Sequence, residues 1–298
     1  MSKKYLLTGA GFSKSFGALL CSELTAIFFN SLIQEKEIQK EIINRADLHN
    51  FEQILSEIRK SYPDKIGTIQ KILEDIFRQM QSNMNHRHEL PNQTNFQENS
   101  VAHFFWKFDC IFTLNQDSFS DMKKDKFSTR FGDHHPNMAF SNQRNSDKLS
   151  LKNGNNIPYI ELHGAYDWKD VFILGSNKEE EIQSRPQIKK FHEFFEKSLC
   201  ENGSKLVIIG YSFCDSHINK IIHKGIERGL EIFIWDPGVL NILNGIKSNT
   251  IDGGWLTYDD FLPEVKKDDL RKTLRGYLPK NFILTGNDKE HIYRFLDS

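Results

Sequence analysis

The sequence predicts an α/β fold with a mainly parallel sheet that is covered by helices on both faces. Short apolar runs of strand length alternate with segments of helical periodicity along much of the chain. The runs are apolar throughout, as in strands that are buried on both faces. Several of them end in glycine or small polar residues, which is typical of ligand-binding edges in such sheets. A chain of 298 residues is long enough for one large domain with insertions.

The N-terminal part begins with a short apolar strand at residues 4–8. A helix is expected from Ser13 to Phe29, where large apolar residues recur at three- and four-residue spacing. Charged residues with periodic Ile and Leu then predict helical structure from Ser31 to Ser82, broken near its middle by Pro63 because proline cannot continue a helix. The polar stretch 83–100 is typical of a surface connection or a cap over a cleft, so we treat about 31–100 as a helical and polar insertion.

The middle of the chain returns to apolar patterns after this insertion. An aromatic helix at Val101–Phe108 leads into a strand at Cys110–Leu114. A second polar insertion, without clear periodicity, covers about 118–156. The segments that follow alternate between strand and helix patterns, at Pro158–Leu162, Val171–Leu174, Pro186–Leu199, Lys205–Ile209, Ser216–Arg228 and Glu231–Trp235.

The last part of the chain gives a weaker pattern. Residues of about 240–298 mix short apolar pieces with charges and predict no definite elements, so we treat them as a C-terminal extension. The whole chain, 1–298, is expected to form a single domain with these three additions.

Composition excludes several functional classes. The formal net charge is -1 and the charges are mixed, so neither dedicated nucleic-acid binding nor membrane-surface binding is indicated. No apolar run is long enough to span a bilayer, and the N-terminus lacks the apolar core of a signal peptide, so we expect a cytoplasmic protein. The four cysteines have none of the short pair spacings of zinc sites, and no metal or disulfide is predicted; they are Cys21, Cys110, Cys200 and Cys214.

Two glycine turns are the most informative motifs. Gly9-Ala-Gly-Phe-Ser13 follows a strand and precedes a helix, which suits a diphosphate because glycine lets the backbone approach and a helix N-terminus favours an anion. The motif departs from the dehydrogenase fingerprint in the place of its third glycine and in lacking a later acidic residue for a ribose. A tight turn without a ligand therefore remains open. The second turn, Gly210-Tyr-Ser-Phe213, also follows a buried strand.

Three side chains at strand ends are candidates for chemistry. An amide such as Asn115 can bind a carboxamide or a ribose hydroxyl, and a carboxylate such as Asp117 can hold a hydroxyl or stabilise positive charge on a sugar. His163 precedes Gly164 at the end of another strand and can act as a general base at neutral pH. The alternatives are a solvated turn or helix cap for the first two residues, and a packed or surface residue for the histidine.

Taken together, four segments resemble the sirtuin-like NAD-cleaving domains of bacterial anti-phage defence proteins. The resemblance covers Tyr5 to about Pro237, and the two insertions fall where that family varies. The matching segments are Gly9–Ser13, Thr113–Asp117, Glu161–Gly164, and Ile209–Phe213 with Asp215, His217 and Asn219. Cys214 holds a place that is often glycine in the family, which weakens the expectation of close backbone approach there.

The resemblance implies a sirtuin-type Rossmann-like fold that binds NAD as a substrate at the carboxyl ends of its strands. His163 would be the catalytic base, with Asn115 and Asp117 near the nicotinamide and its ribose. The residues implied in cofactor binding are Gly9, Ala10, Gly11, Phe12, Ser13, Thr113, Gly210, Tyr211, Ser212, Asp215 and Asp236.

The resemblance also bears on the reaction. Deacylating sirtuins usually carry four zinc-binding cysteines in two short pairs, which this chain lacks. The expected function is therefore an NAD glycohydrolase that releases nicotinamide and ADP-ribose and depletes NAD in anti-phage defence when activated. A deacylase or ADP-ribosyltransferase and a non-catalytic NAD- or ADP-ribose-sensing module remain alternatives. The expected partners are further copies of the chain and a separate activator, either a HerA-type ATPase or an Argonaute-like protein.

Overall fold

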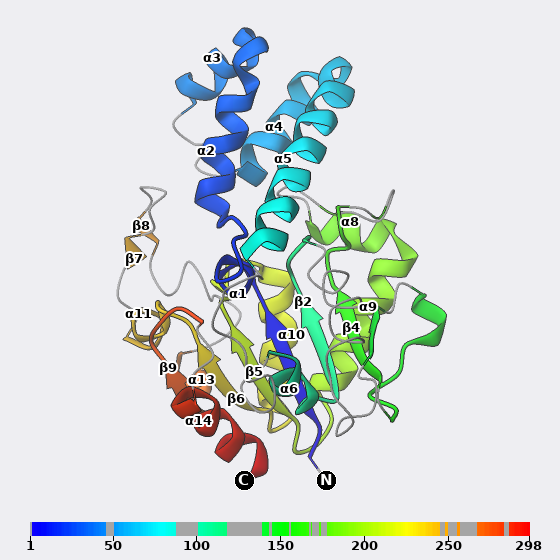
Figure 1. The fold of residues 1–298 in the computed structure, drawn as a ribbon, viewed down its shortest axis with the longest axis vertical. Coiled ribbons are helices and arrows are strands. Elements are labelled where there is room, and N and C mark those ends of the chain that lie inside the picture. Colours follow the sequence, from blue (N-terminus) through cyan, green and yellow to red (C-terminus); the bar gives the residue numbers. More distant parts are fainter. Residues whose placement is uncertain are drawn as a thin grey trace.

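The computed structural model has a central seven-stranded sheet in the order β3-β4-β2-β1-β5-β6-β9 (Figure 1). Every pair of neighbouring strands is parallel. The structure describes residues 2–45, 51–87, 101–117, 139–142, 145–154, 156–166, 168, 173, 178–244, 248–249, 255–256, 267–282 and 286–298. The strands of the sheet are β1 Lys4–Thr8, β2 Cys110–Thr113, β3 Ala139–Asn142, β4 Asn156–Glu161, β5 Lys205–Ile209, β6 Glu231–Trp235 and β9 Leu274–Leu278.

Helices connect and cover these strands, which confirms the predicted α/β class. A small antiparallel pair, β7 Ser248–Asn249 and β8 Trp255–Leu256, lies outside the main sheet. The α-helices are α1 Ala10–Lys14, α2 Cys21–Ser31, α3 Lys36–Asn44, α4 Phe51–Ser61, α5 Ile66–Arg87, α6 Val101–Trp106, α8 Lys178–Ser184, α9 Pro186–Leu199, α10 Ser216–Glu227, α11 Val239–Asn244, α13 Lys267–Thr273 and α14 Gly286–Asp297. Short 3-10 helices are η1 Leu32–Gln34, η2 Pro63–Lys65 and η3 Ser146–Lys148.

Both faces of the sheet are buried, which explains why its central strands are apolar throughout. Successive side chains of a strand point to opposite faces. In β1, Leu6 therefore packs on the side of α6, α14 and the helices α2 to α5, whereas Tyr5 and Leu7 pack on the side of α9, α10 and α13. All three side chains are fully buried.

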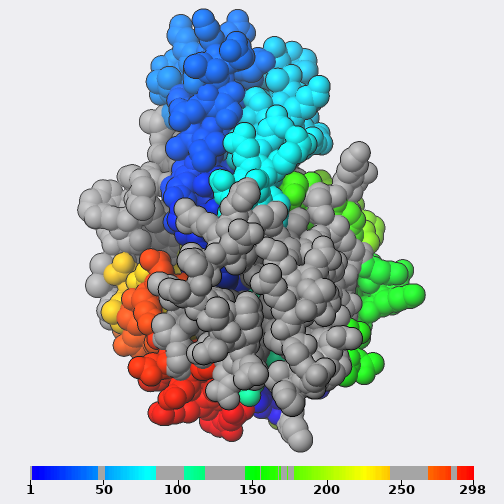
Figure 2. Space-filling model, in the orientation of Figure 1, coloured from blue at the N-terminus to red at the C-terminus, as the bar shows by residue number. Residues whose placement is uncertain are grey.

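Helices α2 to α5 form a projection that rises from the carboxyl edge of the sheet (Figures 1 and 2). Their buried apolar residues recur at helical spacing, as in Ile54, Leu55 and Ile58 of α4. The predicted break is confirmed, because α4 ends at Ser61 and Pro63 begins η2 before α5 starts. No helix in the described parts of the chain combines the length and apolar content needed to cross a membrane.

The expected helix from Ser13 to Phe29 is wrong, because α1 ends at Lys14 and α2 begins only at Cys21. Gly17 adopts a positive φ of 100°, a conformation that ends a helix and that glycine adopts readily. The backbone N–H groups of Phe16 and Ala18 both donate to the carbonyl of Ser13 and close this turn. Phe16 and Leu19 in this turn still pack on the core. Their spacing in the sequence is therefore the same as in one continuous helix, which explains the wrong prediction.

Two edge strands were not predicted. β3 lies inside the segment expected to be a polar insertion, and β9 lies in the segment treated as a C-terminal extension. β9 pairs with β6, where Gly276 lets the ring of Phe233 approach the backbone closely. α14 follows β9 and packs on the sheet through residues such as Ile292 and Phe295. The predicted strand at Val171–Leu174 lies outside the described residues except for Ile173, as does most of the polar stretch 83–100.

Candidate functional site

The carboxyl ends of β1 and β5 form the switch point of the sheet. These strands are neighbours, but the chain continues from β1 to β2 on one side and from β5 to β6 on the other. Connections that leave two adjacent parallel strands in opposite directions open a crevice between them, where such sheets bind ligands. The two glycine turns, 9–13 and 210–213, follow these two strands.

The glycine turns touch each other through their backbones. The N–H of Gly9 donates to the carbonyl of Ile209 at 2.9 Å, and that of Gly11 donates to the carbonyl of Gly210 at 3.0 Å. A Cβ added to Gly210 would lie 2.3 Å from the backbone nitrogen of Phe12, and the φ of Gly210 is +62°. The approach of the two turns therefore requires glycine independently of any ligand.

Asn115 joins its own loop to the first glycine turn. Its Nδ2 donates to the carbonyl oxygen of Gly9 at 2.9 Å and to Oγ of Ser13 at 2.7 Å. Its backbone N–H donates to Oγ1 of Thr113 at 3.1 Å. Asn115 and Asp117 are only 8 % and 3 % exposed. The structure thus places the amide nitrogen of Asn115 in a positioning contact, so that its amide oxygen is the atom left for a ligand.

The remaining residues of the first turn divide between core and surface. The ring of Phe12 is buried among other aromatic rings, with its centroid 5.6 Å from that of Phe105 and 4.9 Å from that of Phe282. Its expected role in cofactor binding can therefore involve only its backbone. Ala10 and Gly11 are partly exposed at the edge of the sheet.

A hydrogen-bonded side chain holds the second turn in shape. Phe213 has a positive φ of 59°, which is uncommon for a bulky residue. Nδ2 of Asn219 donates to the carbonyl of Phe213 at 2.8 Å, and the hydroxyl of Tyr211 donates to Oδ1 of Asn219 at 2.9 Å. Both side chains are buried, whereas Ser212 is exposed at the tip of the turn. The motif therefore combines a rigid support with one accessible hydroxyl.

Asp236 follows β6 at the same edge of the sheet. Its Oδ1 accepts the N–H of Gly238 at 2.7 Å. Burial raises the pKa of this carboxyl from 3.8 to about 6, against the opposing effect of that hydrogen bond. The side chain is thus held in its turn and is costly to ionise.

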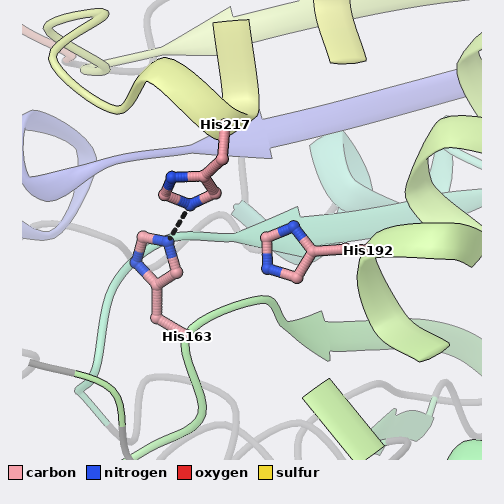
Figure 3. A group of neighbouring side chains, drawn as sticks. All are labelled: His163, His192 and His217. Carbon is pink, nitrogen blue, oxygen red and sulfur yellow. Dashed lines mark hydrogen bonds between the residues drawn. The ribbon is translucent and has the colours of Figure 1, made fainter. Parts of the chain in front are cut away.

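His163 lies in a cluster of three histidines from different elements, which Figure 3 shows with their rings turned toward a common centre. His163 follows β4, His192 comes from α9, and His217 from the first turn of α10. Nε2 of His163 is 2.9 Å from Nε2 of His217. Only one of these two nitrogens carries the shared proton, so the hydrogen bond fixes complementary tautomers in the pair. Nε2 of His192 is 2.9 Å from the carbonyl oxygen of Leu162 and donates to it.

All three imidazoles are neutral at pH 7. Burial lowers the pKa of His163 well below its ordinary value of 6.5, and the Lys178 ammonium lowers it further. Burial is also the main reason why the pKa of His192 falls to about 3 and that of His217 to about 4. Protonation of any of these rings would place a positive charge where little water can solvate it.

A partly buried ion network lies beside the cluster. Nζ of Lys178 is 2.6 Å from Oδ1 of Asp215 and 2.7 Å from Oε1 of Glu52. Burial alone would raise the pKa of Asp215, but the Lys178 ammonium together with His163 and His217 holds that pKa well below its ordinary value. For Glu52 burial prevails and raises the pKa. The network connects α4 of the projection to the residue that precedes α10.

The predicted site residues therefore fall into two groups along one edge. Gly9, Ser13, Asn115 and Gly210 are joined directly at the switch point. His163 is linked to the Asn115 loop through Ile173, whose N–H donates to the carbonyl of His163 and whose carbonyl accepts from Nε2 of Gln116.

Sequence reasoning gave no role to His192, Glu52, Lys178 or His217. The signal for His192 was available, because it occupies the apolar face of a predicted helix next to Phe191 and between Ile188 and Phe195. A polar residue at such a buried position requires a partner. His217 lay within a segment that carried the resemblance, but its spacing alone did not show what it contacts.

A doubly wound parallel sheet with glycine turns and polar side chains at its switch point is typical of α/β proteins that bind dinucleotides. Comparison with protein families narrows this class. Residues 109–238 match the SIR2-like domain. The match begins just before β2 and ends after β6, so it includes all three clustered histidines and leaves the first glycine turn outside. It supports a sirtuin-like domain, and SIR2-like domains bind NAD as a substrate. No curated protein matches the chain.

Proposed function

We propose that this protein is an NAD glycohydrolase that cleaves the bond between nicotinamide and ribose and depletes NAD during anti-phage defence. The observation that carries the proposal is the meeting of both glycine turns, Asn115 and Ser13 at the switch point, in a chain whose residues 109–238 match the SIR2-like domain. This edge also carries His163, the one imidazole of the expected set, which is the usual general base near neutral pH.

NAD fits this edge by the chemistry of its residues. Ala10 and Gly11 are partly exposed at the edge of the sheet, and Ser212 offers an exposed hydroxyl to a phosphate or a ribose. Oγ1 of Thr8, at the end of β1, is buried without a hydrogen-bond partner in the structure. A buried hydroxyl of this kind at the switch point suits a site that is completed by a ligand.

The reaction requires little covalent chemistry from the protein. When the bond between C1′ of the ribose and the nicotinamide nitrogen breaks, its electron pair goes to the nitrogen and neutralises the pyridinium. Water then bonds to C1′ and loses one proton. The amide oxygen of Asn115 orients the carboxamide or the water, and the carboxylate of Asp117 stabilises positive charge that develops on the sugar. The products are nicotinamide, ADP-ribose and a proton.

His163 accepts that proton in the proposed reaction. For His163 to accept this proton at Nδ1, its hydrogen bond to His217 must be donated by Nε2 of His163. Burial makes the free imidazole a weak base. The negative charge of a bound diphosphate would raise its pKa, because an opposite charge favours the protonated form. Substrate binding would thus prepare the base.

Gating is part of the proposal, because an unregulated NAD hydrolase would poison its own cell. Activity would be switched on by assembly of several copies or by a separate partner, such as a HerA-type ATPase or an Argonaute-like protein. The projection of α2 to α5 offers a surface away from the sheet for such contacts (Figure 2).

The test is release of nicotinamide and ADP-ribose from NAD by the full chain, with and without its genomic neighbours. We expect His163→Ala and Asn115→Asp to abolish release while circular dichroism shows a retained fold. The control is His291→Ala, which removes an exposed imidazole on α14. Release by a folded His163→Ala variant would remove the proposed base. Formation of acyl-ADP-ribose from acylated peptides would instead identify a deacylase, and tight NAD binding without turnover under every activating condition would identify a sensor.

A further inference from the structure

The histidine cluster has the composition of a transition-metal site. Among the residues that the structure describes, His163, His192 and His217 form the one group of at least three His, Cys, Asp or Glu side chains with ligand atoms in reach of one another. One ring nitrogen from each lies within 4.8 Å of the other two. Imidazole is a ligand that Zn²⁺, Co²⁺, Ni²⁺ and Cu²⁺ all accept.

The distance between nitrogens bound to one zinc ion lies within the range of nitrogen–nitrogen distances in the cluster. Two nitrogens bound to Zn²⁺ at about 2.05 Å with a tetrahedral angle are about 3.3 Å apart. In the cluster Nε2 of His163 and Nε2 of His217 are 2.9 Å apart, and one ring nitrogen from each histidine lies within 4.8 Å of the other two. Shifts of about an ångström, within reach of small side-chain rotations, would therefore bring the three nitrogens around one ion.

The elements around the cluster favour such a site. The three rings come from three separate elements, so the cluster is formed by the tertiary fold and not by one local turn. His192 donates from Nε2 to the carbonyl of Leu162, the type of second contact that fixes the tautomer of a metal-bound histidine and leaves its other nitrogen with the lone pair. Three protein ligands leave a fourth position open for water or an anion.

The charges next to the cluster are mixed: on His163 the ammonium of Lys178 acts more strongly than the carboxylate of Asp215, whereas on His217 the carboxylate acts more strongly. The ion network beside it holds two carboxylates, of Glu52 and Asp215, and one ammonium, of Lys178. The carboxylate of Asp215 acts on all three imidazoles, and the ammonium acts in the opposite sense on His163 and His217. The network as a whole holds two carboxylates and one ammonium, so a bound metal cation would add positive charge next to an excess of carboxylates.

We propose that His163, His192 and His217 bind a divalent first-row transition-metal ion, with Zn²⁺ as the preferred occupant, and that this ion inhibits the enzyme. The binding claim stands without the proposed function, whereas the inhibition rests on it. A metal-bound His163 has no lone pair for a proton, so an occupied site removes the proposed base. The metal would then be a reversible inhibitor and not a participant in the reaction.

The experiment uses the full chain, stripped of metal with a chelator and titrated with Co²⁺. We expect visible d–d absorption of tetrahedral Co²⁺ that Zn²⁺ displaces at one equivalent, and calorimetry that shows one Zn²⁺ per chain. His192→Ala should weaken binding by more than about 100-fold, the upper end of what loss of an outer contact costs. The matched control is His223→Ala, which removes an imidazole from the same helix as His217 but outside the cluster.

A ligand exchange distinguishes coordination from a structural role. His217→Cys keeps a metal-binding atom, so its Co²⁺ complex should gain the intense ultraviolet absorption of a thiolate bound to cobalt. Binding that is unchanged in both His192→Ala and His217→Cys, or no binding to the wild-type chain, would overturn the proposal. Zn²⁺ binding in a protein that never hydrolyses NAD would retain the metal site and reject only the proposed function. NAD hydrolysis that Zn²⁺ does not slow, despite binding at the cluster, would reject the inhibition.

Discussion

The contact between the two glycine turns allows a graded test of the switch point. In Gly210→Ala the new Cβ would meet the backbone nitrogen of Phe12 at 2.3 Å and the carbonyl carbon of Gly11 at 2.5 Å. These are backbone atoms of a turn fixed by hydrogen bonds, so they cannot swing away as a flexible side chain would. The φ of +62° adds a second penalty.

The magnitude follows from these terms. A left-handed conformation costs a non-glycine residue about 1 to 2 kcal/mol. Overlap with packed atoms costs about 1 to 3 kcal/mol, and loss of the hydrogen bond between Gly11 and Gly210 costs about 1 kcal/mol. The smaller entropy of the unfolded alanine chain returns about 0.4 to 1 kcal/mol. We therefore expect Gly210→Ala to lower the free energy of unfolding by about 3 to 5 kcal/mol.

Two other glycines separate these terms. Gly203 has a φ of +74° but nothing within 4 Å of an added Cβ, so Gly203→Ala carries only the conformational penalty and should cost about 1 kcal/mol. Gly67 lies in helix α5 with open space and no such φ, so Gly67→Ala should stabilise by about 0.5 to 1 kcal/mol. Denaturant unfolding of the three variants measures the series. A Gly210→Ala variant no less stable than Gly203→Ala would refute the packed contact between the turns.

Three further substitutions test other parts of the site. Lys178→Met leaves two partly buried carboxylates without their shared ammonium and should destabilise the protein by up to about 3 kcal/mol in denaturant unfolding near neutral pH; unchanged stability would contradict the contribution of this network. Asp236→Asn should raise the free energy of unfolding by up to about 3 kcal/mol at about pH 8, since the folded-state pKa of about 6 lies above the unfolded value of 3.8 and the folded carboxyl is costly to ionise. The gain should vanish at about pH 4, where the folded carboxyl is already protonated, and equal gains at both values would exclude this cause. Asn219→Ala removes the hydrogen bonds to Phe213 and Tyr211 and should cost about 2 to 4 kcal/mol; a thermal melt matching the wild type would show that the turn does not depend on them.

The central strands could be predicted because burial on both faces leaves a direct trace in the sequence. β1 and β5 are mostly apolar after an initial lysine, and each is followed by a glycine that the contact between the two turns requires. The edge strands leave no such trace. β9 reads Leu-Arg-Gly-Tyr-Leu and is half exposed, so Arg275 and Tyr277 hide its strand character. Its place depends on contact with β6, which no local pattern expresses.

Only the part of the candidate site that lies directly at the strand ends could be predicted from the sequence. Turns at strand ends can be assigned to one edge of a parallel sheet from the chain alone, and the structure brings Asn115 to Ser13 as that argument requires. The histidine cluster depends on how α9 packs against α10 and on which residues of each helix face the strand ends. A lone histidine such as His192 gives no sign of its partners until that packing is known.

The salt bridges of Lys178 have a mechanical consequence. The ammonium of Lys178 forms salt bridges both to Glu52 in the projection and to Asp215, the residue before α10. The two carboxylates are therefore connected through one side chain. If α4 moves away from the sheet, either the salt bridge between Lys178 and Asp215 or the one between Lys178 and Glu52 must break. His217 stands two residues beyond Asp215. A movement of the projection would therefore act, through Lys178 and Asp215, on the first turn of α10, which carries His217.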